Sequence, residues 1–379
     1  MGVFMEEKCI AVENTTVYSY AGIVAESFAA VSRSPRTQET SMQITRRHIV
    51  AVLAVAAIAV PLAQAPAQAQ TPRAARLGYI LPESHPQGAG AKKLAELVAA
   101  KTSGRVKVQT FGNGSLGDEL KMISQVQGGV LDLLIVTTSP LAATVKPLGA
   151  LDIPFLFENE SEVDAVLGGP VGAKLLAAVE PFGMVGLGWM EAGFRNMTNS
   201  KRAINRVDDF AGLKVRTMQN KIFIEAFNDL GTNPVPMAFT ELFTAMETKA
   251  VDGAEGPAAV IESNKWYEVQ KYVTLTRHAF ASFMVVASRK FWDSLTPEDQ
   301  KALRESVQEA GVWQRKLNRE KDTEAVASLR KAGMQVGELP PSEKTQMRAR
   351  VKPVAESVAK DSGQALVAEV NAEIAKVRK

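Results

Sequence analysis

Short apolar runs rich in β-branched residues alternate with helical patterns along most of this chain, and this alternation restricts the fold more than any other feature. It is typical of an α/β fold. Strands are predicted near 75–80, 105–110, 132–137, 184–189, 213–217 and 282–288. Helices are predicted between them, at 87–102, 117–128, 161–180, 219–230, 239–249 and 257–271.

Beyond Phe291 the pattern becomes wholly helical. Thr296 suits an N-cap and Pro297 suits the first helical position, while Gly333 is typical of the residue that follows a helix. We therefore expect a helix or helix pair of more than ~30 residues. Such a helix is long enough to run across two lobes.

The N-terminal part of the chain resembles an export signal. From Met42 a basic start with Arg46 and Arg47 is followed by an apolar run and then by Ala67-Gln68-Ala69, a small-x-small cleavage pattern. The run is shorter than the roughly 20 residues that a membrane-spanning helix needs. We interpret 42–69 as a cleaved signal peptide, with an uncleaved anchor as the alternative, and 1–41 as an extension upstream of the true start. The export route, Sec or twin-arginine, stays open.

Cysteine content and charge narrow the class of protein. The only cysteine is Cys9, so a mature chain starting near Gln70 has no disulfide, no cysteine metal site and no thiol nucleophile. The net charge of +3 is spread without a basic block, which argues against nucleic acid as a partner. These features favour a periplasmic protein. We expect no metal and no cofactor.

The segment "FGNGSLGDEL", residues 111–120, matches the spacing G-x-G-x-x-G, and Asp132 follows about 20 residues after the first glycine. In a dinucleotide fold that acidic residue stands at the carboxyl end of a strand, whereas Asp132 precedes one. The strand before the glycines also alternates charged and apolar residues, as a half-solvated strand does. We interpret the motif as a turn between an edge-like strand and a helix that starts near Asp118.

No set of catalytic residues is visible. His85 and His278 are far apart and lack metal-ligand spacing, so we expect no enzyme activity. Arg195 and Arg216 follow or end predicted strands, where α/β sheets bind ligands, and a guanidinium group pairs well with a carboxylate. Each arginine can also be explained as a surface or ion-paired residue.

Long segments of the chain resemble the solute-binding proteins of the tripartite ATP-independent periplasmic (TRAP) transporters, the DctP family. The resemblance rests on "LPESHP", "FGNGSLGDELKMISQVQGGVLDLLIV", "LDIPFLFENESEVDAVLGGPVG", "GFRNMTNSKRAI", "DFAGLKVRTM", "LGTNPVPMAFTELFTAMETKAVDG", "KWYEVQKYVTLTRH" and "FWDSLTPEDQKALRES". It implies a monomeric periplasmic binding protein of the type II-like, two-lobed kind, with a long helix crossing both lobes. It also implies a small organic acid as ligand and a TRAP membrane permease, driven by an ion gradient, as partner.

The resemblance divides the mature chain between two lobes that close on the ligand. Residues 72–192 with 282–321 are expected to form the first lobe, and 193–281 with 322–379 the second. The hinge is expected around 191–195 and 281–284.

The resemblance also implies a set of ligand-binding residues. Arg216 matches the arginine that forms the main salt bridge with the ligand carboxylate, and Arg195 matches a second contact. Phe239 matches the aromatic residue that packs on the ligand, and the segment after the strand near 132–137 is expected to contribute from the other lobe. The remaining candidates come from that segment and from others that face the cleft: Thr137, Thr138, Ser139, His85, Glu191, Glu255 and Gly256.

The chain departs from the family at one useful place. Many members read "VDGQENP" where this chain reads "VDGAEGP", so that Ala254 and Gly256 replace two carboxamides, and Ala192 stands where many members have Asn. We expect room for a bulkier or less polar acid, and a ligand other than sialic acid. Two rival hypotheses remain: a sensing subunit with the same fold, and a periplasmic oxidoreductase that uses the glycine loop.

Overall fold

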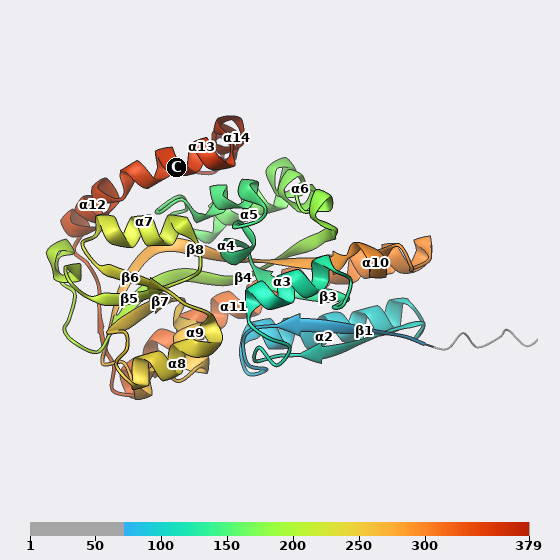
Figure 1. The fold of residues 1–379 in the computed structure, drawn as a ribbon, viewed down its shortest axis with the longest axis horizontal. Coiled ribbons are helices and arrows are strands. Elements are labelled where there is room, and N and C mark those ends of the chain that lie inside the picture. Colours follow the sequence, from blue (N-terminus) through green and yellow to red (C-terminus); the bar gives the residue numbers. More distant parts are fainter. Residues whose placement is uncertain (1–71, 379) are drawn as a thin grey trace, which may run out of the picture. The chain divides into compact units, whose positions relative to one another are not determined.

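The computed structural model describes residues 72–378. The interpretations of 1–41 as an extension and of 42–69 as a signal peptide fall outside the described residues, as does Cys9. The described chain is an α/β structure with one mixed sheet, covered by helices (Figure 1).

The sheet has the strand order β2-β1-β3-β8-β4-β7-β5-β6 within the described residues, and β9 pairs with β8 beside this path. Strands β1 and β3 are parallel, as are β1 and β2, while β8 runs antiparallel to both β3 and β4. The strand bounds are β1 Arg73–Tyr79, β2 Val106–Phe111, β3 Leu133–Thr137, β4 Met184–Asn199, β5 Lys214–Thr217, β6 Asn233–Pro236, β7 Gly253–Gly256, β8 Tyr272–Ser288 and β9 Gln335–Gly337.

Two long antiparallel strands, β4 and β8, join the two lobes. The C-terminal part of β8 pairs with β3, and so carries β1 and β2 as neighbours. The C-terminal part of β4 pairs with β7, and so carries β5 and β6. Because β4 and β8 are antiparallel, these two groups of strands lie at opposite ends of the pair. The predicted two-lobed α/β fold is confirmed, while the residue ranges of the lobes stay a prediction.

Both crossing strands are longer than predicted. We expected strands near 184–189 and 282–288, but β4 continues to Asn199 and β8 begins at Tyr272. Every residue of β4 is buried, including Glu191 and Arg195, whose charges interrupt the apolar pattern. The prediction stopped where polar residues enter the strand. It was also wrong to place Arg195 just past the end of a strand, because it lies within β4.

Seventeen helical segments are described, of which four are 3-10 turns. The predicted helix 161–180 is broken at Gly169, which is extended and precedes Pro170. The predicted helix 257–271 ends at Ser263 because Lys265 adopts φ +55°. The bounds are α2 Pro86–Lys101, α3 Glu119–Gln127, α4 Thr138–Leu141, η1 Lys146–Asp152, α5 Glu160–Gly168, α6 Pro170–Ala177, η2 Glu180–Phe182, η3 Val207–Phe210, α7 Lys221–Asp229, α8 Phe239–Glu247, α9 Ala258–Ser263, η4 Trp266–Glu268, α10 Arg289–Trp292, α11 Pro297–Lys331, α12 Pro341–Arg350, α13 Lys352–Ser362 and α14 Gln364–Ala375.

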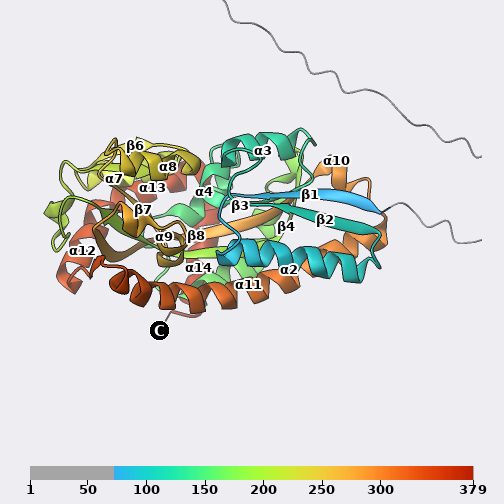
Figure 2. The ribbon, with the colours of Figure 1, turned by 90° about the horizontal axis from the view of Figure 1, so that it is seen from below.

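The predicted long helix is confirmed as α11, a single helix of 35 residues. Thr296 caps it by accepting a hydrogen bond from the Asp299 amide, and Gly333 follows its end at φ +95°. Helix α11 packs on α2 and β4 along one part of its length and on α9 along another, which Figure 2 shows from below. The chain beyond Phe291 is not wholly helical, however, because β9 follows α11 and pairs with β8.

The glycine motif is a structural turn, as predicted. Strand β2 is the edge of the sheet, and Asp118 caps α3 by accepting a hydrogen bond from the Lys121 amide. A Cβ atom on Gly112 would lie 2.5 Å from the ring of Tyr79, so only glycine fits there. The carboxylate of Asp132 accepts a hydrogen bond from the Arg76 amide at 2.8 Å, and thereby ties β3 to β1.

Candidate ligand-binding site

A cavity lies where the two groups of strands meet across β4 and β8. It encloses about 410 Å³ of empty space, including the part that is open to solvent. On one side the wall is formed by two residues that follow β1, by the last residue of β3 and by the first residue of α3. On the other side it is formed by residues of β7, α8, α9 and η4 and by residues in and just after β5, and the crossing strands β4 and β8 contribute the rest. The lining residues are Ile80, Leu81, Glu119, Thr137, Ala192, Arg195, Arg216, Met218, Phe239, Glu255, Gly256, Val260, Trp266, Ala281 and Phe283.

Arg195 reaches the cavity from β4, but its charge is already compensated. Its Nε and Nη2 atoms donate to the carboxylate of Glu255 on β7, and Nη2 also donates to the Glu255 carbonyl at 2.9 Å. The Nε2 atom of His278 lies 3.4 Å from the same carboxylate. Burial raises the pKa of Glu255, but Arg195 and His278 outweigh this effect and lower that pKa to about 2. Arg195 and Glu255 therefore form a buried ion pair.

Arg216 reaches the cavity from β5 and has no such partner. Its side chain is buried, and its Nε and Nη2 atoms donate to the Met237 carbonyl at 3.0 and 2.8 Å. No carboxylate of the described residues forms an ion pair with it. Burial is the main cause that lowers the pKa of Arg216 to about 10, so it remains a cation at neutral pH. A buried cation without a counter-ion is costly, and an anionic ligand would offset that cost.

Aromatic side chains form one wall of the cavity. Phe239 is the first residue of α8, and its ring lies 6.2 Å from the Trp266 ring, centroid to centroid, and 5.9 Å from the guanidinium carbon of Arg216. A Cβ atom on Gly256 would lie 3.1 Å from the Trp266 ring. The expected spare room beside Gly256 is thus filled by an indole that the sequence analysis did not single out.

Glu119 is a second lining residue that the sequence analysis missed. It is the first residue of α3, and its Oε1 atom accepts a hydrogen bond from the Thr137 amide at 2.8 Å. Burial raises its pKa, while hydrogen bonds from Thr137 and the charges of Arg216 and Arg195 lower it less strongly. The available signal was the glycine turn, because Gly117 and Asp118 set the point at which α3 begins.

Thr138 and Ser139 lie behind the cavity wall, at the start of α4 and not in a loop. The Thr138 hydroxyl donates to the Ser282 carbonyl at 3.3 Å, and the Ser139 hydroxyl donates to Asp152 at 2.5 Å. Asn220 donates to the same Asp152 carboxylate at 2.9 Å. Of this segment, only Thr137 lines the cavity.

His85 lies outside the cavity wall. Its Nδ1 atom accepts a hydrogen bond from the Gln87 amide at 2.9 Å and so caps α2. The residue is fully buried, and burial lowers its pKa to about 3, so the ring is neutral at physiological pH.

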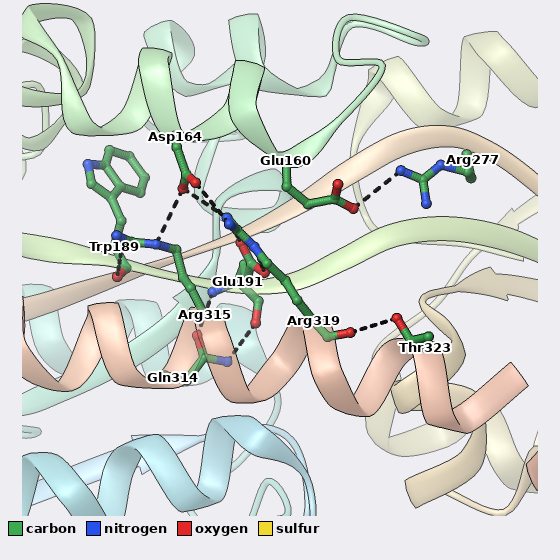
Figure 3. A network of polar contacts seen from close by, with 9 residues as sticks. All are labelled: Glu160, Asp164, Trp189, Glu191, Arg277, Gln314, Arg315, Arg319 and Thr323. Carbon is green, nitrogen blue, oxygen red and sulfur yellow. Dashed lines mark hydrogen bonds and ion pairs between the residues drawn. The ribbon is translucent and has the colours of Figure 1, made fainter.

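Glu191 also points away from the cavity, toward α11 (Figure 3). Arg319 donates to the Glu191 carboxylate at 2.9 and 3.0 Å. The Glu191 amide donates to Oε1 of Gln314 at 3.0 Å, and Nε2 of Gln314 donates to the Glu191 carbonyl at 2.7 Å. Its neighbour Ala192 lines the cavity, as alternation along a strand requires. Glu191 thus supports the cavity floor from the opposite face. Within residues 72–378, no three acidic, histidine or cysteine side chains are grouped as a metal ion would need.

A cavity enclosed by two lobes, with one free buried cation and an aromatic wall, defines a binding protein for a small anion. Residues 77–361 match the profile of bacterial extracellular solute-binding protein family 7, the DctP family of TRAP transporter solute-binding proteins, and the chain belongs to this family. Members of this family are solute-binding proteins.

Three similar proteins illustrate the match. The 2,3-diketo-L-gulonate-binding periplasmic protein YiaO of Escherichia coli (strain K12) is 38% identical over 261 residues, which are 69% of this chain and 80% of that protein. The sugar acid binding protein of Advenella mimigardefordensis strain DPN7T, in complex with galactonate, has a TM-score of 0.79 and 39% identity, and the match covers 81% and 99% of the two chains. A TRAP periplasmic solute binding protein from Polaromonas sp. JS666, bound to D-erythronate, has a TM-score of 0.76 and 39% identity, with 79% and 98% covered.

Proposed function

We propose that this protein captures a small organic acid between its two lobes in the periplasm and delivers it to a TRAP membrane permease for ion-gradient-driven uptake. The observation that carries the proposal is Arg216, a buried guanidinium without a carboxylate partner among the described residues, in the wall of the cavity. The three similar proteins, which are named for or bound to sugar acids, support a carboxylate as ligand.

The geometry of Arg216 indicates how a carboxylate binds. The Met237 carbonyl occupies the edge formed by Nε and Nη2, which leaves the end formed by Nη1 and the second Nη2 hydrogen for the ligand. A carboxylate fits this end with two parallel hydrogen bonds. Phe239 then covers the carbon chain of the ligand, and Arg195, held by Glu255, keeps its Nη1 group as a further donor.

Substitution of Arg216 tests the proposal. A thermal-shift screen over a panel of organic acids identifies a ligand, and calorimetry then compares the wild type with Arg216→Ala. Because the variant removes the only uncompensated cation of the cavity wall, we expect a loss on the order of 2 to 5 kcal/mol in binding free energy. Arg330→Ala, an exposed arginine on α11, is the matched control and should bind as the wild type does. An unchanged dissociation constant for Arg216→Ala would contradict the proposal.

A further inference from the structure

Glu119 and Arg216 face the same cavity from opposite lobes. Arg216 is supplied by β5, and Glu119 by the first turn of α3. The Thr137 amide donates to Oε1 of Glu119, and the Thr137 side chain is also hydrogen-bonded to this carboxylate, so that Thr137 holds Glu119 in place in the wall. The cavity therefore has a cationic end and an acceptor end.

The charged residues of the wall are equal in number, and only one of the two cations lies outside an ion pair. Two lining residues are cations, Arg195 and Arg216, and two are carboxylates, Glu119 and Glu255. Arg195 and Glu255 neutralise one another, so Arg216 alone is free to compensate a ligand carboxylate. A second ligand carboxylate finds no free cation in the wall. It has the carboxylate of Glu119 as a neighbour in the cavity wall instead.

We propose that the cavity selects hydroxy monocarboxylates over dicarboxylates, and that Glu119 is the residue that makes the selection. This inference rests on the proposed function and narrows its ligand class. The carboxylate of the ligand binds Arg216, and a hydroxyl group further along the chain donates a hydrogen bond to Glu119. An ionised carboxylate has no hydrogen to donate, so a dicarboxylate brings two like charges together and leaves Glu119 without its bond.

Matched pairs of ligands isolate this effect. D-erythronate and meso-tartrate have the same carbon chain and the same inner hydroxyls, and differ only in whether the last carbon is an alcohol or a carboxylate. D-gluconate and D-glucarate form the corresponding six-carbon pair. Calorimetry at about pH 8, where the carboxyl groups of the free ligands are ionised, measures all four with the wild type. We expect each monocarboxylate to bind more than about tenfold more tightly than its dicarboxylate, since juxtaposed like charges are strongly unfavourable.

Glu119→Gln tests the role of the residue itself. The amide oxygen of glutamine still accepts the hydrogen bond from Thr137, and the size is unchanged, so the fold is kept while the charge is removed. We expect the preference for the monocarboxylate to fall at least about fivefold, mainly through tighter binding of the dicarboxylate. Glu241→Gln is the matched control: the charge of Glu241 also acts on Arg216, but the residue is exposed on α8 and does not line the cavity.

The outcomes separate this inference from the function on which it rests. If the tightest ligand of the organic-acid panel is a dicarboxylate, or if Glu119→Gln leaves the ratio within each pair unchanged, the selection by Glu119 is wrong while acid binding stands. If no acid of the panel binds the wild type, both proposals fail. The ratios measured with the wild type do not depend on whether the variant folds.

Discussion

Two arginines of the same cavity have different roles because of their neighbours. Arg195 is paired with Glu255 and contributes no net charge, whereas Arg216 has only the Met237 carbonyl. The sequence motifs identified both arginines and Phe239 as cavity residues, because the spacing within "GFRNMTNS", "GLKVRTM" and "PMAF" is local. They did not reveal the pairing, since Arg195 and Glu255 are distant in sequence and meet only when β4 and β7 align.

A buried acid behind the cavity makes the stability of the protein depend on pH. Burial raises the pKa of Asp152 from 3.8 to about 7, although hydrogen bonds from Ser139 and Asn220 oppose this effect. Between these two pH values the folded state holds a proton that the unfolded state releases, so stability falls as pH rises from about 4 to about 7. Asp152→Asn removes this dependence because an amide does not titrate; its oxygen accepts from Asn220 while its NH2 group donates to the Ser139 hydroxyl, which replaces both hydrogen bonds.

Denaturant unfolding at several pH values between 4.5 and 7.5 measures the effect. The wild type should lose stability relative to Asp152→Asn across this window, by an amount on the order of a few kcal/mol. A constant difference between the two proteins over the whole window would show that Asp152 titrates normally.

At the scale of the elements, the crossing strands were the hardest to predict and are the most informative. One apolar end of each strand was predicted, while the rest of β4 contains Glu191, Arg195 and Asn196, all buried. The hydrophobic periodicity and the strand propensity of a sequence do not predict buried polar residues inside a sheet. The burial of such residues depends on hydrogen-bond and ion-pair partners from other elements. Trp266 escaped prediction for a related reason: Lys265, with φ +55°, ends a helix that the sequence pattern appeared to continue.

Gly193 is where β4 departs from regular geometry. The register of β4 against β8 shifts between Glu191 and Gly193, and Gly193 has φ +111°. A Cβ atom there has its nearest neighbour at 3.5 Å, so Gly193→Ala adds no clash and its cost is that of the backbone alone. We expect a loss of about 1 to 2 kcal/mol in the free energy of unfolding, measured in urea.

Gly337→Ala on β9 is the comparison, since that position has an ordinary φ and no atom within 4 Å of the added Cβ. An equal loss of stability in both variants would mean that the positive φ of Gly193 is not the cause of the loss in Gly193→Ala.

At the scale of the whole described molecule, the composition of the cavity wall leads us to expect that the two lobes move relative to each other. The wall residues come from both groups of strands, so we expect the lobes to close on a ligand that enters between them. We expect the hinge around 191–195 and 281–284, where β4 and β8 cross between the lobes. Helix α11 bonds β4 at Glu191 through Gln314 and Arg319, directly beside this region.

Small-angle scattering tests the closure. Addition of an acid that binds should reduce the radius of gyration of the wild type, because the lobes close on the ligand. The Arg216→Ala variant should show no change at the same ligand concentration. Identical scattering curves for the free and the saturated wild type would argue against a closing hinge.

The place of β8 in the sheet also sets the order in which the protein can fold. Strand β8 lies between β3 and β4, yet it is made only after every other strand of the main path. Until Ser288 has left the ribosome, β3 and β4 lack the strand that separates them, and the contacts that unite the sheet are long-range in sequence. A nascent chain without β8 therefore has no complete sheet to fold onto.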